Sequence, residues 1–234
     1  MSLRLESLPG YGREALLCPP THFGVRYAIN PQMKATRESG IAVDKNRAFE
    51  QWMQLAYFLK ALGARLRYIM PEARCPDMVF TANAGFLYKK RLILSRFKRE
   101  ERRKEEAHFL RYFSGTLWMP TVALPPTLCF EGQGDAFWHG DILLLGHGFR
   151  SEKKGAAVAM KAAEYTGAAM LLQLVDENFY HLDTCFCSLG KDILWYPPAF
   201  AEEARAAVRD LARGGRSVEA EEEDAKRFVC NGIY

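Results

Sequence analysis

The sequence predicts one α/β domain over residues 1–234, in which two strands, a helix and a further strand form a unit that repeats. The first observation is periodicity: apolar residues alternate between strand and helix spacing, and the pattern returns roughly every 50 residues. The second is composition, because 49% hydrophobic and 26% charged residues are typical of a globular chain with a sizeable core. Repetition on this scale indicates an array of supersecondary units.

The first predicted elements lead into this array. Residues 15–19 form a short apolar strand that ends at two prolines. Residues 46–63 carry apolar side chains at helical spacing and predict an amphipathic helix. Residues 66–69 follow as a strand. A strand, a helix and a second strand therefore precede the repeated units.

Three repeated units follow. Their predicted strands span residues 78–80, 84–88, 92–94, 136–138, 142–146, 171–174, 185–189, 193–195 and 217–220. Their predicted helices span residues 99–113, 151–166 and 199–213. Polar turns stand at the same place in each unit, at residues 88–91, 138–141 and 190–192. Residues 228–234 look like the opening strand of one more unit.

Charge and hydropathy patterns exclude several classes of protein. The formal net charge is +4, and the basic run at 98–104 alternates with glutamates, which is typical of a solvated helix face and not of a nucleic-acid interface. The chain has no run of about 18 apolar residues to predict a membrane span, and its N-terminus lacks the apolar core of a secretory signal. We therefore expect a cytoplasmic protein that binds neither nucleic acid nor membrane.

The cysteines and histidines show no metal-binding spacing. The six cysteines are Cys18, Cys75, Cys129, Cys185, Cys187 and Cys230, and none belongs to a CxxC pair. The five histidines are scattered along the chain. In a chain of this size these patterns predict reduced thiols, no disulfide scaffold and no metal site.

An acidic, glycine-rich turn and a histidine motif carry the strongest functional signal. The turn is Phe130–Asp135, and the motif His181–Thr184 follows about fifty residues later. In an extended strand His181 and Asp183 would face the same way, and Glu131 or Asp135 would supply a second carboxylate. A histidine flanked by carboxylates suits proton transfer near neutral pH. A strand histidine with ordinary structural hydrogen bonds explains the same residues, and both interpretations stay open.

The run Gly146–Ser151 predicts a loop that ends in a helix N-cap. Ser151 has a side chain that favours this position, and Glu152 follows in the first helical turn. A helix N-terminus of this kind also attracts anions such as phosphate. The prediction is therefore that the Ser151 hydroxyl accepts a hydrogen bond from a backbone N–H in the first turn of the following helix.

A series of motifs, taken in chain order, resembles a known family. The segments are Cys18–Phe23 with Tyr27–Pro31, Pro76–Phe86, Arg102–Glu105, the Glu131 turn and His181–Asp183. Together they resemble the amidinotransferase and arginine-dihydrolase-like branch of the guanidino-group-modifying (pentein) superfamily, over nearly the whole chain. The resemblance implies that family's fold, a five-bladed α/β propeller of ββαβ units around a central active site.

The resemblance also implies a chemistry. In this family a cysteine thiolate attacks the guanidinium carbon of an arginine-like substrate, and the amidino-thioether is then hydrolysed or passed to another amine, without metal or organic cofactor. His181 would be the general acid and base. Glu131 would hold His181 or bind the guanidinium, and Asp183 would bind it as well, because paired carboxylates match its planar donors.

Further residues are implied to bind the rest of the substrate. Arg102 would clamp its α-carboxylate. Asn83 on the first active-site loop and Asn30 in the first segment resemble the arginine dihydrolases, which take arginine to ornithine. The implied ligand is therefore a small guanidino compound of the arginine type.

The nucleophile departs from the family pattern. In the family it lies in the last blade, beyond the position of Tyr234, so the resemblance predicts a chain truncated before that blade. Cys185 shares strand parity with His181 and Asp183 and is the one candidate stand-in nucleophile. The alternative function is a non-catalytic arginine-binding paralogue or an inactive gene fragment. An open propeller edge would favour self-association.

Overall fold

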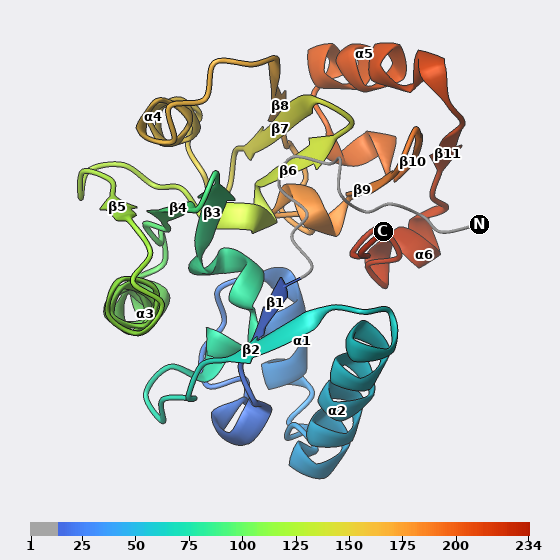
Figure 1. Ribbon diagram of the computed structural model, residues 1–234. Coiled ribbons are helices and arrows are strands. Elements are labelled where there is room, and N and C mark those ends of the chain that lie inside the picture. The colour runs from blue at the N-terminus through green and yellow to red at the C-terminus, as the bar shows by residue number, and fades with distance from the viewer. Residues whose placement is uncertain (1–13) are drawn as a thin grey trace.

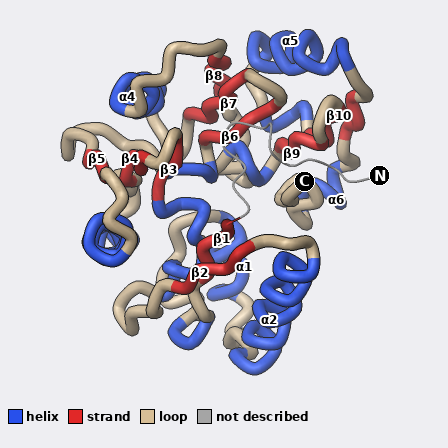
Figure 2. Tube along the Cα trace, in the orientation of Figure 1, coloured by secondary structure: helices blue, strands red, loops and turns tan. Residues whose placement is uncertain are grey.

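The computed structural model of the protein describes residues 14–234 and has four small sheets grouped around a common centre (Figure 1). The longer helices lie on the outside of these sheets (Figure 2). The predicted α/β fold of repeated units is confirmed.

Three of the sheets share one topology, an antiparallel hairpin with a third strand parallel to the second. The hairpins are β3 (Gly85–Tyr88) with β4 (Arg91–Leu94), β6 (Ala136–His139) with β7 (Ile142–His147), and β9 (Phe186–Leu189) with β10 (Asp192–Trp195). The helices and third strands are α3 (Glu100–Leu110) and β5 (Thr121–Ala123), α4 (Lys153–Ala162) and β8 (Ala169–Gln173), and α5 (Glu202–Leu211) and β11 (Ser217–Glu219). A parallel third strand requires the helical crossover that each unit contains.

The hairpin turns need backbone conformations that most residues avoid. Gly140 and Gly190 have positive φ angles of 55° and 74° in the second and third hairpins. The first hairpin turns instead on Lys89 and Lys90, with φ angles of 44° and 61°. Two-residue hairpin loops favour such angles because their twist matches that of the strands. The turns predicted from sequence therefore lie where expected.

The fourth sheet is smaller. It pairs β1 (Glu14–Leu17) in parallel with β2 (Arg65–Tyr68), and α1 (Pro31–Glu38) and α2 (Lys45–Ala61) lie between them in the chain. Within residues 14–234, β1 pairs with no antiparallel strand. In topology β1 and β2 correspond to the second and third strands of the other units.

Each hairpin is preceded by a short 3₁₀ turn, and these three leading turns form the centre of the molecule. They are Thr81–Ala84 before β3, Gly132–Gly134 before β6 and Leu182–Thr184 before β9. The second contacts both of the others. Gly134 lies so close to its neighbours that a Cβ atom there would come within 2.4 Å of the Asn83 amide nitrogen. The absence of a side chain at Gly134 therefore lets the turns meet.

Apolar clusters join neighbouring units. Phe86 and Ile93 of the first unit share one cluster with Leu143 of the second. Leu144 and Leu172 of the second unit share another with residues of β9, β10 and α5. Because these cores are continuous across unit boundaries, the leading turns are held rigidly against each other.

Several predicted elements are wrong or were missed. Residues 78–80 are not a strand: Pro76–Val79 is a 3₁₀ turn, which the proline at its start favours. Residues 228–234 are not a strand either, since α6 (Glu222–Lys226) ends in turns and irregular chain. The sequence analysis missed α1 and β5, whose few residues carry little apolar periodicity. The helix predicted over 99–113 ends its α-helical part at Leu110 and continues as a π-helical segment.

Candidate active site

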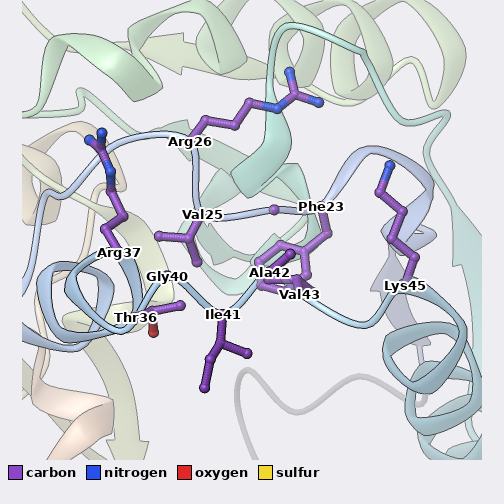
Figure 3. A pocket seen from close by; sticks show the side chains of 11 residues that line it. Phe23, Val25, Arg26, Thr36, Arg37, Gly40, Ile41, Ala42, Val43 and Lys45 are labelled. Atoms are coloured by element: carbon purple, nitrogen blue, oxygen red, sulfur yellow. The ribbon is translucent and has the colours of Figure 1, made fainter.

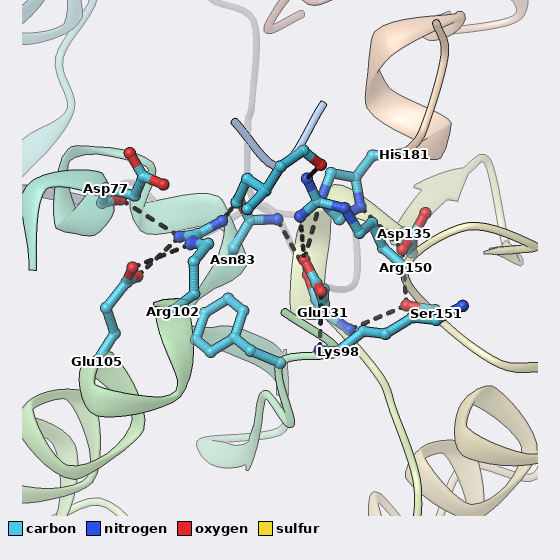
Figure 4. A network of polar contacts seen from close by, with 12 residues as sticks. Asp77, Asn83, Lys98, Arg102, Glu105, Glu131, Asp135, Arg150, Ser151 and His181 are labelled. Atoms are coloured by element: carbon cyan, nitrogen blue, oxygen red, sulfur yellow. Dashed lines mark hydrogen bonds and ion pairs between the residues drawn. The ribbon is translucent and has the colours of Figure 1, made fainter. Parts of the chain in front are cut away.

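The leading turns bring the predicted site residues together. Figure 4 shows Glu131 near the middle, with Asn83 and Arg102 on one side and Asp135, Arg150 and His181 on the other. Glu131 and His181 occupy the same place in their units, the N-cap position of the leading turn. Two residues far apart in sequence are therefore placed side by side by the internal repeat.

His181 lies between two carboxylates. Its Nδ1 is 2.9 Å from Asp135 Oδ2, and its Nε2 is 3.2 Å from Glu131 Oε2. The first contact is a hydrogen bond, whereas the second is in ion-pair range but lacks hydrogen-bond geometry. The ring is 4% exposed, so both carboxylates act on it with little screening by water. The sequence left open whether Glu131 or Asp135 would reach the histidine, and in the structure both carboxylates lie next to the imidazole.

These contacts set the charges at the centre of the site. Burial alone would lower the pKa of His181, but Asp135 and Glu131 outweigh it and raise that pKa to about 9. Burial would raise the pKa of Glu131, but His181, Arg150 and Arg102 outweigh it and hold that pKa at about 2. At neutral pH the pair is therefore an imidazolium beside a carboxylate, and His181 holds a proton that it can donate.

Asn83 and Arg102 form the neighbouring part of the network. Asn83 Oδ1 accepts a 3.0 Å hydrogen bond from Arg102, and its Nδ2 donates to the Glu131 carbonyl at 3.1 Å. The Arg102 guanidinium donates to both oxygens of Glu105, at 3.0 and 2.8 Å, and is 3% exposed. A forked pair of this kind fixes the plane of the guanidinium. Glu105 therefore orients Arg102 toward the leading turns.

Two site residues were missed by the sequence analysis. Arg150 is 2% exposed, lies 3.2 Å from Glu131 Oε2, donates to the Ile29 carbonyl at 2.9 Å and stacks over the Tyr180 ring. Its only sequence signal was a basic residue directly before Ser151 in a glycine-rich loop.

The second missed residue is Asp77. It is 1% exposed, and its Oδ2 accepts a 2.9 Å hydrogen bond from the Tyr27 hydroxyl while its Oδ1 has no partner. Burial raises the pKa of this carboxyl. It lies within the Pro76–Phe86 motif, so its place in that motif was the available signal. A buried oxygen without a partner is an acceptor available to a ligand.

Asp183 and Cys185 lie differently from the sequence expectation. His181 caps a 3₁₀ turn and does not belong to a strand, so the strand-parity argument that gave all three residues a common face is wrong. Asp183 is half-buried, and burial raises its pKa to about 7. Cys185 is fully buried, and its thiol lies 3.8 and 3.5 Å from the backbone oxygens of His181 and Leu182. Burial raises the Cys185 pKa well above its ordinary value.

Ser151 is not the predicted N-cap. Helix α4 begins at Lys153, and Glu152 is its N-cap residue, without a side-chain capping bond. The Ser151 hydroxyl instead points into the site, where it donates to Asp135 Oδ2 at 2.6 Å and accepts from the Glu131 backbone N–H at 2.9 Å. The prediction failed because the Ser151 oxygen accepts from the Glu131 N–H instead of a helix N–H, while its proton goes to the Asp135 carboxylate.

Asn30 lies at the edge of the site. It caps α1 through a 2.7 Å hydrogen bond from the Met33 N–H to its Oδ1. It also lines a cavity of about 460 Å³ together with Arg150 and Tyr180. This cavity reaches the network at Arg150, whose guanidinium lies 3.2 Å from Glu131.

A second cavity of about 360 Å³ lies at the α1–α2 connection. Figure 3 shows that the charged ends of Arg26, Arg37 and Lys45 do not converge at one point. The Arg26 guanidinium is already bonded to the backbone oxygens of Ala73 and His22. The arrangement offers no focused site for a charged ligand.

Residues 14–234 lack the features of a metal centre and of a membrane-spanning helix. They contain no group of three or more His, Cys, Asp or Glu side chains placed to bind a metal ion. Their helices include none with the length and apolar character needed to span a membrane.

Known proteins resemble this chain over most of its length, although no family model matches it. It is 39% identical over 221 residues to the bifunctional arginine dihydrolase/ornithine cyclodeaminase ArgZ of Synechocystis sp. The aligned residues make up 93% of this chain and 30% of that protein. It is 37% identical over 200 residues to the N(G),N(G)-dimethylarginine dimethylaminohydrolase of Mycobacterium tuberculosis, covering 85% and 63% of the two chains. The chain thus spans less than two thirds of the length of either relative.

A solved structure gives the same result. The N-terminal domain of ArgZ, a cyanobacterial arginine dihydrolase, has been determined as a mutant bound to substrate. It superposes with a TM-score of 0.86 at 38% identity, covering 94% of this chain and 80% of that one. The chain therefore belongs to the guanidino-group-modifying (pentein) superfamily. Its relatives within it are arginine dihydrolases and dimethylarginine dimethylaminohydrolases.

Proposed function

We propose that this chain binds arginine by its guanidinium group and carries the acid–base apparatus of an arginine dihydrolase. The observation that carries the proposal is the buried His181 between Asp135 and Glu131, with a nitrogen left for proton exchange. The relatives named as arginine dihydrolases support arginine as the substrate.

The charges of the site match those of arginine. Glu131 and Asp183 are the proposed partners of the guanidinium. Glu131 Oε2 already lies 3.2 Å from the guanidinium of Arg150, which supports its fitness to bind such a group. Arg102 is the proposed partner of the α-carboxylate, and the unpartnered Asp77 Oδ1 that of the α-ammonium. Asn30 and Asn83 line the ligand between these ends.

The proposed reaction starts from a thiolate. A sulfur–carbon bond forms at the guanidinium carbon, a carbon–nitrogen bond breaks, and ammonia leaves with the proton that His181 donates. A water molecule then gives a proton to His181 and displaces the sulfur from the carbon. His181 therefore acts first as acid and then as base at one nitrogen.

The six cysteines of the chain are poor candidates for this thiolate in the present conformation. Burial raises the pKa of every one of them: Cys18, Cys75, Cys129, Cys185, Cys187 and Cys230. A thiol becomes a nucleophile when its pKa is lowered, not raised. This observation favours a second candidate function, arginine binding without turnover by these residues alone.

Calorimetric titration with L-arginine tests the binding proposal. We expect a Kd on the order of millimolar, and Glu131→Gln should weaken binding because the guanidinium loses its carboxylate. Arg102→Ala should weaken it as well, and pairing this change with Glu105→Gln avoids leaving a buried carboxylate alone. Arg103→Ala, on the exposed face of α3, is the control. Absence of heat with arginine, or equal binding by all variants, would contradict the assignment.

Product release separates the two candidate functions. We expect no ornithine or citrulline from arginine above the buffer rate, because burial raises the pKa of all six thiols and a thiol in that state is a poor nucleophile. Product formation that Cys185→Ala abolishes would make Cys185 the nucleophile and establish turnover.

A further inference from the structure

The turn between β7 and α4 forms several hydrogen bonds with residues 129–131, the segment that carries Glu131. Arg150 and Ser151 are adjacent in this turn and contact Glu131 through its carboxylate and its backbone N–H, respectively. The Glu152 N–H donates to the Cys129 carbonyl at 3.0 Å. Because the turn is anchored on both sides, Ser151 is held in one orientation at 1% exposure.

The hydrogen bonds of Ser151 have only one consistent direction. The Glu131 backbone N–H can only donate, so the Ser151 oxygen accepts there. The Ser151 proton is then directed to Asp135 Oδ2, at 2.6 Å. The same oxygen receives His181 Nδ1 at 2.9 Å, while Oδ1 receives the Leu182 N–H at 3.0 Å. Asp135 is thus fixed as an acceptor, and His181 must carry a proton on Nδ1.

We propose that Ser151 is a positioning residue, which fixes Asp135 so that Nδ1 of His181 stays protonated and Nε2 is the nitrogen that exchanges protons with the substrate. The inference rests on the proposed acid–base role of His181 and adds to it a residue that touches neither substrate nor histidine. It acts by donating a hydrogen bond to Asp135 Oδ2, the same oxygen that accepts from His181 Nδ1.

Other charged groups face His181 and must stay unchanged in a test. Glu131 faces Nε2, Arg150 approaches through Glu131, and Asp183 acts from the same leading turn as His181. The Tyr180 ring lies 5.2 Å from the imidazole. Ser151 carries no charge, so its replacement by alanine removes its hydrogen bonds to Asp135 and from the Glu131 N–H but none of these charged groups.

Nitrogen-15 NMR of the imidazole measures the effect directly. In the native protein we expect the Nδ1-protonated tautomer above the His181 pKa, with His181→Gln identifying the resonances among the five histidines. In Ser151→Ala, Asp135 Oδ2 loses one donor and its charge acts more fully on the imidazolium. The apparent pKa of His181 should therefore rise by about half a unit to one unit. Ser151→Cys keeps the volume with a weak donor and should shift it in the same direction.

Ser95→Ala is the matched control. Ser95 is also fully buried near the leading turns, but its hydroxyl has no hydrogen-bond partner. This change should leave the titration of His181 as in the native protein. An unchanged or lowered His181 pKa in both Ser151 variants would overturn the inference.

Arginine binding distinguishes this inference from the proposed function. If the native protein binds no arginine, the proposed function fails, while the NMR result still decides the role of Ser151. If arginine binds and the Ser151 variants titrate like the control, only the inference fails.

Discussion

Four buried charges of the site are tolerated because each has a partner of opposite sign within reach. Arg102, Glu131, Arg150 and His181 are all less than 5% exposed. Isolated charges at such positions would cost several kcal/mol each, and pairing with hydrogen bonds offsets that cost. A substrate with both charge signs would therefore compete for these four groups with the partners that they already hold, whereas Asp77 Oδ1 has no hydrogen-bond partner to displace.

His181 should make stability depend on pH. Its folded pKa of about 9 lies above the ordinary 6.5, so its contribution is complete below pH 6.5 and is lost as pH rises through about 9. The native protein should lose up to about 3 kcal/mol of unfolding free energy over this interval. His181→Gln should not show that loss. Urea unfolding at pH 6 and pH 9.5 measures both, and parallel pH profiles would contradict the ion-pair assignment.

The identity of the site residues could be predicted from sequence more fully than their geometry. The motifs indicated Glu131, which lies in a glycine-rich turn, and His181, which stands two residues before Asp183. The pairing of Ser151 with Asp135 could not be predicted, since serine before a helix has a strong local preference for capping. A contact between residues 135 and 151 depends on how the turn between β7 and α4 lies against the residue directly before β6, which local sequence does not encode.

At the scale of elements, sequence periodicity predicted hairpins and outer helices well and the 3₁₀ turns poorly. The strands β4, β7 and β10 are apolar and flanked by turn residues, so they are recognisable. The leading turns have only three or four residues each, too few for any period to appear. Because the site is built on these turns, the strand parity assumed for His181–Cys185 was the main error.

Helix α4 gives a test of how closely these elements approach. A Cβ atom on Gly155 would lie 2.0 Å from the Cys129 carbonyl oxygen, which is backbone and cannot move aside. Helix propensity alone predicts that Gly155→Ala stabilises the protein by up to about 1 kcal/mol. We expect the opposite, destabilisation by about 2 kcal/mol, because overpacking displaces the helix. Thermal melting compares it with Gly24→Ala, where the added Cβ meets no atom within 4 Å.

A stabilised or unchanged Gly155→Ala variant would contradict this close approach. The same displacement would move the turn that carries Arg150 and Ser151. Arginine affinity should therefore fall in Gly155→Ala and stay unchanged in Gly24→Ala, which links the packing of an outer helix to the centre of the molecule.

On the scale of the whole molecule, the internal repeat explains why the site lies at the centre. The N-cap positions of the three leading turns are Phe80, Glu131 and His181. Repetition brings equivalent positions to a common centre, and only their side chains differ. Two of the three equivalent residues are charged and opposed, and the third is aromatic. A single structural unit, used three times, thus produces an asymmetric polar site.

Helix α2, which lies between the two strands of the fourth sheet in the chain, leaves apolar side chains in contact with solvent. Helix α2 exposes Phe58 at 61% and Leu62, which follows it, at 79%. These residues are one turn apart and therefore lie on one side of the helix end. Together with the edge of β1 that no strand within residues 14–234 pairs, this surface should promote self-association, because unpaired strand edges and apolar patches both favour contacts between copies.

Sedimentation velocity over a range of concentrations should therefore show association. Replacing Phe58 and Leu62 with lysine should shift the distribution toward monomer, since each change removes apolar area and adds charge repulsion between copies. Trp118→Lys is the control, because Trp118 is 85% exposed but lies on a different element. A monomer at all concentrations would show that the α2 surface does not cause self-association. Association that all three substitutions reduce equally would mean that it depends on general hydrophobicity and not on this helix.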